Sequence, residues 1–391
     1  MLKWIIVGGG IQGTTMAIHL LKQNKVSLED LAIIDPHNEP LQSWKRCTDA
    51  ISMPYLRSPV VHQLDVEPFS LQSYAKNTIY DESTAFYGPV KRPSLEIFNE
   101  HCDHLATDAS LEKAWVQGRV ERAEKYNGHW LVTLETGQKL TAENLVLAIG
   151  VGEQPMWPDW ATALKKKAGS SIFHIFDEDL PALETLKGSI TIIGGGISSV
   201  HLAIKLSNMF PAQVTLMKRH SFRLHDFDSD PGWLGPKKQL SFRKHGCYQK
   251  RRQQILDARN KGSITKELHS KLLHRVRKGK LQIKEAQITS ASIRNSETIF
   301  YDQTYREIHR AGTVILATGF MPVLPGRKWL MPMVEEQQLK CAECGFPIVT
   351  SSLQWGPNLY VTGALAELEI GPIARNISGA RQAAERIVGS L

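Results

Sequence analysis

Residues 4–13 read WIIVGGGIQG, a short apolar run that leads into a cluster of glycines. Residues 14–21 follow with the composition of a helix. A strand, a glycine turn and a helix in this order are typical of a dinucleotide-binding βαβ unit. In such a unit Gly8 forms the tight turn, Gly10 lets the backbone approach a pyrophosphate, and Gly13 lets the helix pack closely on the strand. The N-terminus of the helix then presents unpaired N–H groups to the phosphates.

The stretch after the glycine turn supports the same interpretation. Residues 31–35 read LAIID, a second apolar run that ends in an acid. Asp35 stands about twenty residues past the glycines, where a carboxylate accepts hydrogen bonds from an adenosine ribose. A glycine loop in an unrelated α/β domain is the alternative interpretation.

A second unit with the same pattern begins at residues 189–199, which read SITIIGGGISS. Gly194, Gly196, Ser198 and Ser199 take the places of the first glycine turn and the start of its helix. Two such motifs, each between a strand and a helix, are much harder to attribute to chance than one. We therefore predict two dinucleotide-binding units in one chain.

The second unit differs from the first at the end of its second strand, where Lys218 and Arg219 replace the acid. Basic residues at this place suit the 2′-phosphate of NADP, through charge and through guanidinium–phosphate hydrogen bonds. The sequence therefore predicts FAD in the first unit and NADP in the second. The alternative is that both cations are solvated residues at a strand end.

The length of 391 residues is comfortable for two domains. We predict an α/β fold with two Rossmann-like domains, the NADP domain inserted into the FAD domain. The expected FAD domain comprises residues 1–155 and 320–391, and the expected NADP domain comprises residues 156–319. Within the latter, residues 235–284 are rich in Lys and Arg and predict a basic helical insertion. A nucleic-acid or protein surface is one interpretation of this insertion, but its aromatic residues are sparse, which favours a solvated face.

Composition sets the remaining limits. No run approaches the roughly twenty apolar residues of a membrane span, and no cleavage site follows the first apolar run. Five scattered cysteines do not form a disulfide framework, so we expect a cytoplasmic protein. The net charge of +8 suits an enzyme that binds phosphorylated cofactors, and we expect neither a membrane nor a nucleic-acid partner. No metal site is expected, and the oligomeric state is not predicted.

Candidate residues for the reacting end of the cofactor lie in irregular segments. The proline-rich excursion of residues 36–93 is expected to form the wall around it and holds Trp44, Arg57 and His62. Arg57 could stabilise anionic reduced flavin, or it could equally be structural. His62 could relay a proton, but a structural role is the favoured interpretation.

The C-terminal part of the chain contributes further candidates. A buried strand ends at Gly363, and residues 369–375 read EIGPIAR. We expect Gly371, Pro372 and Ile373 to open the last helix and to point its N–H groups at the flavin.

The order of these segments resembles that of the two-dinucleotide-binding flavoproteins over essentially the whole chain. Within that group it is most similar to the class B flavin monooxygenases of the N-hydroxylating lysine and ornithine type. The resemblance rests on the two glycine motifs, on Ala317-Thr318-Gly319, on residues 53–59 (MPYLRSP), and on Phe173-His174. It implies that NADPH reduces FAD, that O₂ reacts next, and that retained NADP⁺ shields the site from water. The substrate-binding lysine and asparagine of the ornithine enzymes have no match, so a small-molecule substrate is expected without being identified.

Two other functions stay open. Cys341 and Cys344 form a C-x-x-C pair that could pass electrons from FAD to a disulfide, which would make the chain an NADPH reductase or dithiol oxidoreductase. Coincidental loop cysteines are the plainer interpretation. The other alternative is a non-enzymatic flavoprotein that senses redox state or NADPH.

Overall fold

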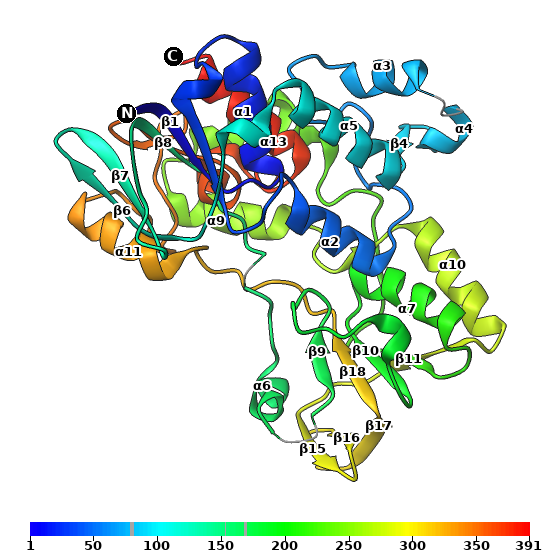
Figure 1. Cartoon of the computed structure of the whole chain (residues 1–391). Helices are drawn as coiled ribbons and strands as arrows, with labels where there is room; N and C mark the ends of the chain where they lie inside the picture. Colours follow the sequence, from blue (N-terminus) through cyan, green and yellow to red (C-terminus); the bar gives the residue numbers. More distant parts are fainter. Residues whose placement is uncertain (79–81, 153, 168–169) are drawn as a thin grey trace.

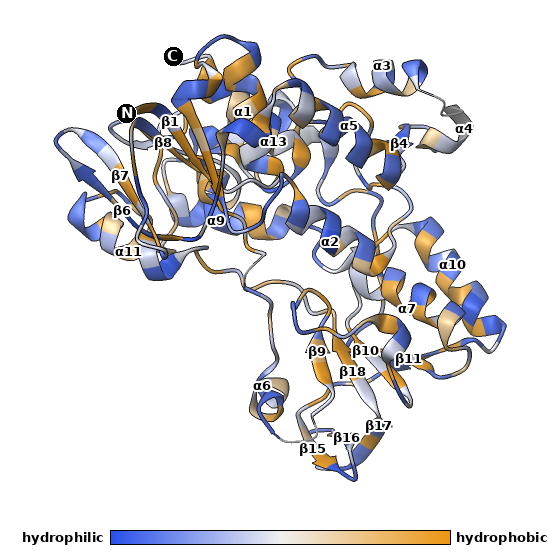
Figure 2. Ribbon diagram, in the orientation of Figure 1, coloured by the Kyte–Doolittle hydropathy of each residue, from blue (hydrophilic) through white to orange (hydrophobic). Residues whose placement is uncertain are grey.

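The computed structural model describes residues 1–78, 82–152, 154–167 and 170–391. Two separate sheets organise these residues, one near the chain termini and one at the far end of the molecule (Figure 1). Their strands are among the most hydrophobic segments of the chain (Figure 2). The predicted α/β fold with two Rossmann-like units is confirmed.

The first sheet has the strand order β19-β20-β8-β1-β2-β5. β1 pairs in parallel with β2 and β8, and β8 pairs in parallel with β20. Helices α1 (Ile11–Lys22) and α13 (Ile377–Val388) pack against each other beside this sheet (Figure 1). The strands are β1 (Leu2–Val7), β2 (Leu31–Asp35), β5 (Trp115–Gln117), β8 (Lys139–Leu147), β19 (Gln354–Gly356) and β20 (Leu359–Val361).

A β-hairpin extends the first sheet from β8. Its strands are β6 (Val120–Tyr126) and β7 (His129–Leu134), which pair antiparallel. Asn127 and Gly128 form the turn with φ of 50° and 83°, the left-handed backbone that an Asn-Gly turn favours. This is the hairpin that the alternating pattern and the Asn-Gly pair predicted.

The second sheet has the order β14-β11-β10-β18-β9, and all of its neighbouring strands run parallel. Helices α7 (Ile197–Met209) and α10 (Lys266–Arg277) pack on it, and their apolar residues share its core. The strands are β9 (Ile172–His174), β10 (Ile190–Ile193), β11 (Val214–Lys218), β14 (Leu281–Glu285) and β18 (Thr313–Leu316).

Further helices and strands connect and flank the two sheets (Figure 1). The other helices are α2 (Gln42–Ile51), α3 (Ser70–Asn77), α4 (Glu82–Ala85), α5 (Leu95–Asp108), α6 (Asp159–Lys165), α8 (Pro236–Lys244), α9 (Tyr248–Ala258), α11 (Arg327–Glu336) and α12 (Glu367–Ile370). The remaining strands are β3 (Phe86–Tyr87), β4 (Arg92–Pro93), β12 (Arg223–Leu224), β13 (Ser263–Ile264), β15 (Ser290–Arg294), β16 (Glu297–Tyr301) and β17 (Glu307–Ala311).

Two of the passages of the chain between the two sheets lie side by side. Pro155 and Phe320 form an antiparallel bridge, flanked by hydrogen bonds from Met156 N to Gly319 O (2.8 Å) and from Met321 N to Gln154 O (2.8 Å). These passages lie at the positions where the sequence places the domain boundaries. The boundaries themselves stay a prediction.

The basic segment of residues 235–284 differs from the single solvated insertion that the sequence predicted. Phe242 of α8 and Ile255 of α9 are buried in the core of the first sheet. Gln239 Nε2 donates to the carbonyl oxygen of Ile370 (2.7 Å), which fixes α8 to the C-terminal part of the chain. Of the three helices in this segment, α10 is the one that packs on the second sheet. The segment is therefore divided between the two halves of the molecule, because α8 and α9 each bury an apolar side chain against the first half.

The last helix begins later than expected. Its first residue is Ile377, and Pro372 lies in a turn that follows Gly371, whose φ is 89°. This turn packs closely on the helix, because a Cβ placed on Gly379 in the helix would lie 2.1 Å from the carbonyl oxygen of Ile373. The expectation that Pro372 stands just inside the helix start is therefore wrong.

Candidate active site

The first glycine turn has the close contacts that its sequence predicted. A Cβ on Gly13 would lie 1.7 Å from the carbonyl oxygen of Gly8, so no side chain fits between helix and turn. Gly10 is different, because a Cβ there would have no heavy atom within 4 Å. The turn is thus closed toward the protein and open at Gly10, on the side where a pyrophosphate is expected.

Asp35 braces this turn. Its Oδ2 accepts a hydrogen bond from the backbone N–H of Gly9 (2.6 Å), and its Oδ1 accepts one from the N–H of His37 (2.9 Å). The indole of Trp115 covers Gly9, since a Cβ on Gly9 would lie 2.0 Å from the ring. The ring Nδ1 of His37 also lies 2.7 Å from Oδ1, and the predicted contact of this carboxylate with a ribose stays a prediction. Nothing in the sequence around Trp115 indicated its place on the glycine turn.

The C-terminal segment meets the same turn through Gln12. The Nε2 of Gln12 donates to the carbonyl oxygen of Ala374 (3.0 Å), and its side chain lies against Gly363. Gln12 Oε1 and Thr362 Oγ1 are buried and have no hydrogen-bond partner within the described ranges. Buried polar atoms without a partner are costly, so these two fit a site that a polar ligand completes. Together with the open face at Gly10, they fit a bound FAD.

The second glycine turn has the close contact of the first, but it is covered where the first is open, because a Cβ on Gly196 would lie 3.3 Å from the Cα of Gly262. A Cβ on Gly194 would lie 2.6 Å from the carbonyl oxygen of Ala317, and the buried Ser199 donates to the carbonyl oxygen of Gly196 (2.7 Å). α7 begins at Ile197 without a side-chain cap, so its first N–H groups are available to a phosphate. Ser198 lies in the same turn and is half-buried.

The two predicted NADP cations lie in different surroundings. Lys218 is buried, and its Nζ forms an ion pair with Glu285 and donates to the carbonyl oxygen of His220 (3.1 Å). This ion pair also holds the pKa of Glu285 below its usual value. Arg219 is exposed. Lys218 therefore holds β11 and β14 together, and of the two residues only the side chain of Arg219 is exposed; its contact with a 2′-phosphate stays a prediction.

Arg57 connects the first half of the chain to loops of the second. Its guanidinium pairs with Asp228 (2.6 Å) and donates to the carbonyl oxygen of Phe227 (2.9 Å) and to Ser263 Oγ (2.9 Å). Its Nε donates to the carbonyl oxygen of Asp226 (3.0 Å). These contacts are those of a residue that positions two segments, and the catalytic role considered for Arg57 gains no geometric support.

His62 and Trp44, the other candidates from the excursion, also have structural surroundings. Burial and the nearby Arg381 lower the pKa of His62 to about 4, so its ring is neutral at pH 7. Trp44 donates its indole N–H to Asn99 Oδ1 (3.0 Å) and packs beside Phe98. The roles predicted for both residues stay predictions.

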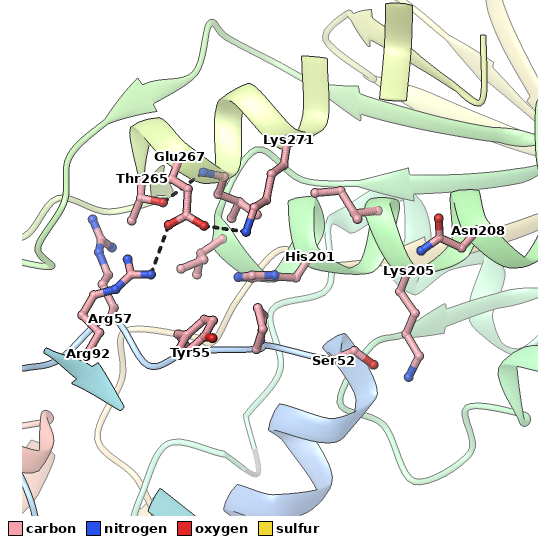
Figure 3. A pocket seen from close by; sticks show the side chains of 14 residues that line it. Ser52, Tyr55, Arg57, Arg92, His201, Lys205, Asn208, Thr265, Glu267 and Lys271 are labelled. Atoms are coloured by element: carbon pink, nitrogen blue, oxygen red, sulfur yellow. Dashed lines mark hydrogen bonds and ion pairs between the residues drawn. The ribbon is translucent and has the colours of Figure 1, made fainter. Parts of the chain in front are cut away.

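A cavity of about 380 Å³ opens between the two halves of the chain (Figure 3). Glu267 of α10 lies at its wall between Arg92 (3.2 Å) and Lys271 (2.5 Å). Lys205 of α7 donates to the carbonyl oxygen of Asp49 (3.1 Å), and His201 faces the same space (Figure 3). Four cations (Arg57, Arg92, Lys205 and Lys271) and one carboxylate thus line a cavity that the sequence did not indicate, since its residues come from four separate segments.

The C-x-x-C pair lies in the loop after α11. Cys341 is half-buried and Cys344 is exposed, and both are free thiols. Burial and the neighbouring Cys344 raise the pKa of Cys341, which lowers the fraction of reactive thiolate at neutral pH.

Within the described ranges no cluster of acids, histidines and cysteines could hold a metal ion. In the same ranges no helix is long and apolar enough to cross a membrane.

Two glycine turns of this kind, each on its own parallel sheet, define an oxidoreductase that binds two dinucleotides. The chain belongs to the pyridine nucleotide-disulphide oxidoreductase family, whose model matches residues 2–385. Membership confirms the predicted oxidoreductase class with FAD and NADP as its cofactors. No curated protein matches the chain in a direct comparison.

Solved structures with the same fold include enzymes of more than one reaction. The ornithine hydroxylase of Pseudomonas aeruginosa is 19% identical with a TM-score of 0.76, over 100% of this chain and 98% of that one. The L-lysine 6-monooxygenase of Pseudomonas syringae is 17% identical with a TM-score of 0.72, over 100% and 99%. The bacillithiol disulfide reductase of Staphylococcus aureus is 17% identical with a TM-score of 0.65, over 100% and 98%. At these identities the similarity is one of fold.

Proposed function

We propose that the chain is an NADPH-dependent flavin monooxygenase that hydroxylates a small molecule, with a primary amine as the first substrate class to test. The observation that carries the proposal is the segment between α9 and β13. Gly262 in this segment lies against the second glycine turn, where a Cβ on Gly196 would be 3.3 Å from its Cα. Arg259 in the same segment donates to the carbonyl oxygen of Pro372 (2.9 Å), in the part expected to hold the flavin. One short segment therefore contacts both predicted nucleotide sites, which supports a function in which the two cofactors act together.

In this proposal each group of residues would bind one of the two cofactors. The first glycine turn, Asp35 and Gln12 would hold FAD, and the second turn with Arg219 would hold NADPH. FAD held there would supply the redox chemistry by which electrons from NADPH reach O₂. The balance is that NADPH, a proton, O₂ and R–NH₂ give NADP⁺, water and R–NHOH. One oxygen atom enters the N–H bond of the amine and the other leaves as water.

The choice of an amine follows from the similar structures. Their names describe hydroxylases or monooxygenases of ornithine, lysine and cadaverine, all of which carry a primary amine. The test is to incubate FAD-loaded protein with NADPH, O₂ and each of these three amines, and to measure NADPH, hydrogen peroxide and the hydroxylamine. Hydroxylamine in proportion to the NADPH consumed supports the proposal. Hydrogen peroxide equal to NADPH with every amine contradicts it for this class.

A second candidate function is a dithiol–disulfide reductase, which the C-x-x-C pair and the bacillithiol disulfide reductase fold favour. Because the pKa of Cys341 is raised, we expect Cys341→Ser with Cys344→Ser to leave NADPH oxidation within about a factor of two of the parent. The assay is steady-state NADPH oxidation with O₂ and with a small disulfide as alternative acceptors. A loss of about a hundredfold, roughly 2.7 kcal/mol, would support the dithiol function instead.

A further inference from the structure

The two glycine turns differ in what lies over their second glycine. A Cβ on Gly10 of the first turn would meet no heavy atom within 4 Å, whereas a Cβ on Gly196 of the second would lie 3.3 Å from the Cα of Gly262. In this type of turn the second glycine is the one that a pyrophosphate approaches. The first turn therefore fits a bound nucleotide as it stands, and the second does not fit one while Gly262 lies on it.

Gly262 belongs to a short connection between the two halves of the molecule, residues 259–263, which we call the cover. Before it, α9 buries Ile255 in the core of the first half, and after it Ile264 lies in the core of the second sheet. Gly262 itself has a φ of 65°, a left-handed backbone that glycine adopts readily. The chain thus crosses from one half to the other at the place where it closes the second turn.

Bonds from Arg57 in the first half hold the cover in place. Its guanidinium donates to Ser263 Oγ (2.9 Å), at the end of the cover. It also pairs with Asp228 (2.6 Å), whose carbonyl oxygen accepts a hydrogen bond from the N–H of Asn260 in the cover (2.8 Å). Arg57 is therefore bonded to the cover directly through Ser263 and indirectly through Asp228.

The closed position of the cover also carries a cost. Arg259, its first residue, donates to the carbonyl oxygen of Pro372 (2.9 Å), but its buried Nε has no hydrogen-bond partner among the residues described. A buried donor without a partner is destabilising. The bonds of Arg57 therefore work against an unfavourable contact, so the balance between a closed and an open position is one that a ligand can shift.

We propose that the cover controls access to the second nucleotide site, that it must leave Gly196 before a nucleotide binds there, and that Arg57 is the positioning residue that holds it closed. Binding then includes the cost of opening, so the apparent affinity for the nucleotide is reduced by the fraction of molecules that are open. The inference rests on the proposed use of NADPH, but not on the reaction with O₂.

The test is equilibrium binding of NADP⁺ to FAD-loaded protein by calorimetry, without O₂ or substrate. Arg57→Met removes the bonds to Ser263 and Asp228, so the open fraction should rise and NADP⁺ should bind about tenfold more tightly than to the parent. Asp228→Asn removes the charge of the exposed partner alone and disturbs the fold less. It should tighten NADP⁺ binding by about threefold.

Arg92→Met is the matched control. Arg92 also joins the first half to the second, through an ion pair with Glu267 of α10 (3.2 Å). Within the described part of the chain, its ion pair and hydrogen bond do not involve the cover. Its removal should therefore leave the dissociation constant for NADP⁺ within about twofold of the parent value.

Two results would overturn the proposal. Dissociation constants in folded Arg57→Met and Asp228→Asn that equal or exceed the parent value would show that these bonds do not keep the site closed, and Asp228→Asn decides alone if Arg57→Met does not fold. An equal gain in Arg92→Met would assign the effect to a general loosening between the two halves. Failure of the monooxygenase proposal is a separate outcome, seen as hydrogen peroxide without hydroxylated product while Arg57→Met still binds NADP⁺ more tightly than the parent.

Discussion

Gly10 allows the effect of a side chain on FAD to be separated from its effect on the fold. Its φ of −77° suits any residue, and a Cβ there meets no protein atom within 4 Å. We expect Gly10→Ala to fold like the parent but to bind FAD at least about tenfold more weakly, because the methyl group stands where the pyrophosphate approaches. Visible flavin absorbance against protein concentration measures the occupancy. Gly246→Ala, also in open space, is the control. Full FAD occupancy in Gly10→Ala would show that FAD does not bind at this turn.

Arg219 carries the prediction of nucleotide preference, since Lys218 is committed to Glu285. Arg219→Ala should raise the KM for NADPH by about tenfold or more and leave the KM for NADH almost unchanged, because only NADPH has a 2′-phosphate. The value of kcat should change little, since the hydride end of the nucleotide is distant. Steady-state kinetics with both nucleotides provide the measurement, and Arg277→Ala, an exposed arginine at the end of α10, is the control. Equal KM values for NADH and NADPH in the parent would contradict this reading of β11.

Arg57 tests how the excursion of the first half is fastened to the loops of the second. Arg57→Met keeps much of the side-chain volume but removes the bonds to Asp228, Phe227 and Ser263. We expect the free energy of unfolding to fall by about 1–3 kcal/mol and flavin reduction at saturating NADPH to change by less than about threefold. Urea unfolding and rapid-mixing reduction measure the two effects. Unchanged stability with a hundredfold slower reduction would make Arg57 a catalytic residue after all.

Local patterns in the sequence predicted the elements that depend on them. Residues 31–35 and the hairpin around Asn127-Gly128 form as expected, because apolar periodicity and turn chemistry act within a few residues. The packing of α8 and α9 could not be predicted in this way. Periodicity shows that a helix has an apolar face, but it does not show which half of a two-sheet protein covers that face.

The candidate site shows the same division. Both glycine turns could be located from the sequence, because each glycine is required by contacts with atoms close to the turn. The role of Lys218 could not, since Glu285 pairs with it from another strand of the sheet. The place of Gly262 over Gly196 likewise depends on the pairing of β12 with β13. The partners in these contacts are far apart in the sequence, so the contacts could not be predicted before the fold was known.

At the scale of the whole molecule, the proposed function requires that a single chain holds FAD and NADPH close enough to exchange a hydride. The most direct measurement is an anaerobic titration of the FAD-loaded protein with NADPH, followed by visible absorbance. We predict that one equivalent of NADPH per bound FAD removes the absorbance of the oxidised flavin completely. Admitting air should restore this absorbance. A protein with full FAD occupancy whose flavin stays oxidised in excess NADPH, while dithionite reduces it, would contradict the account.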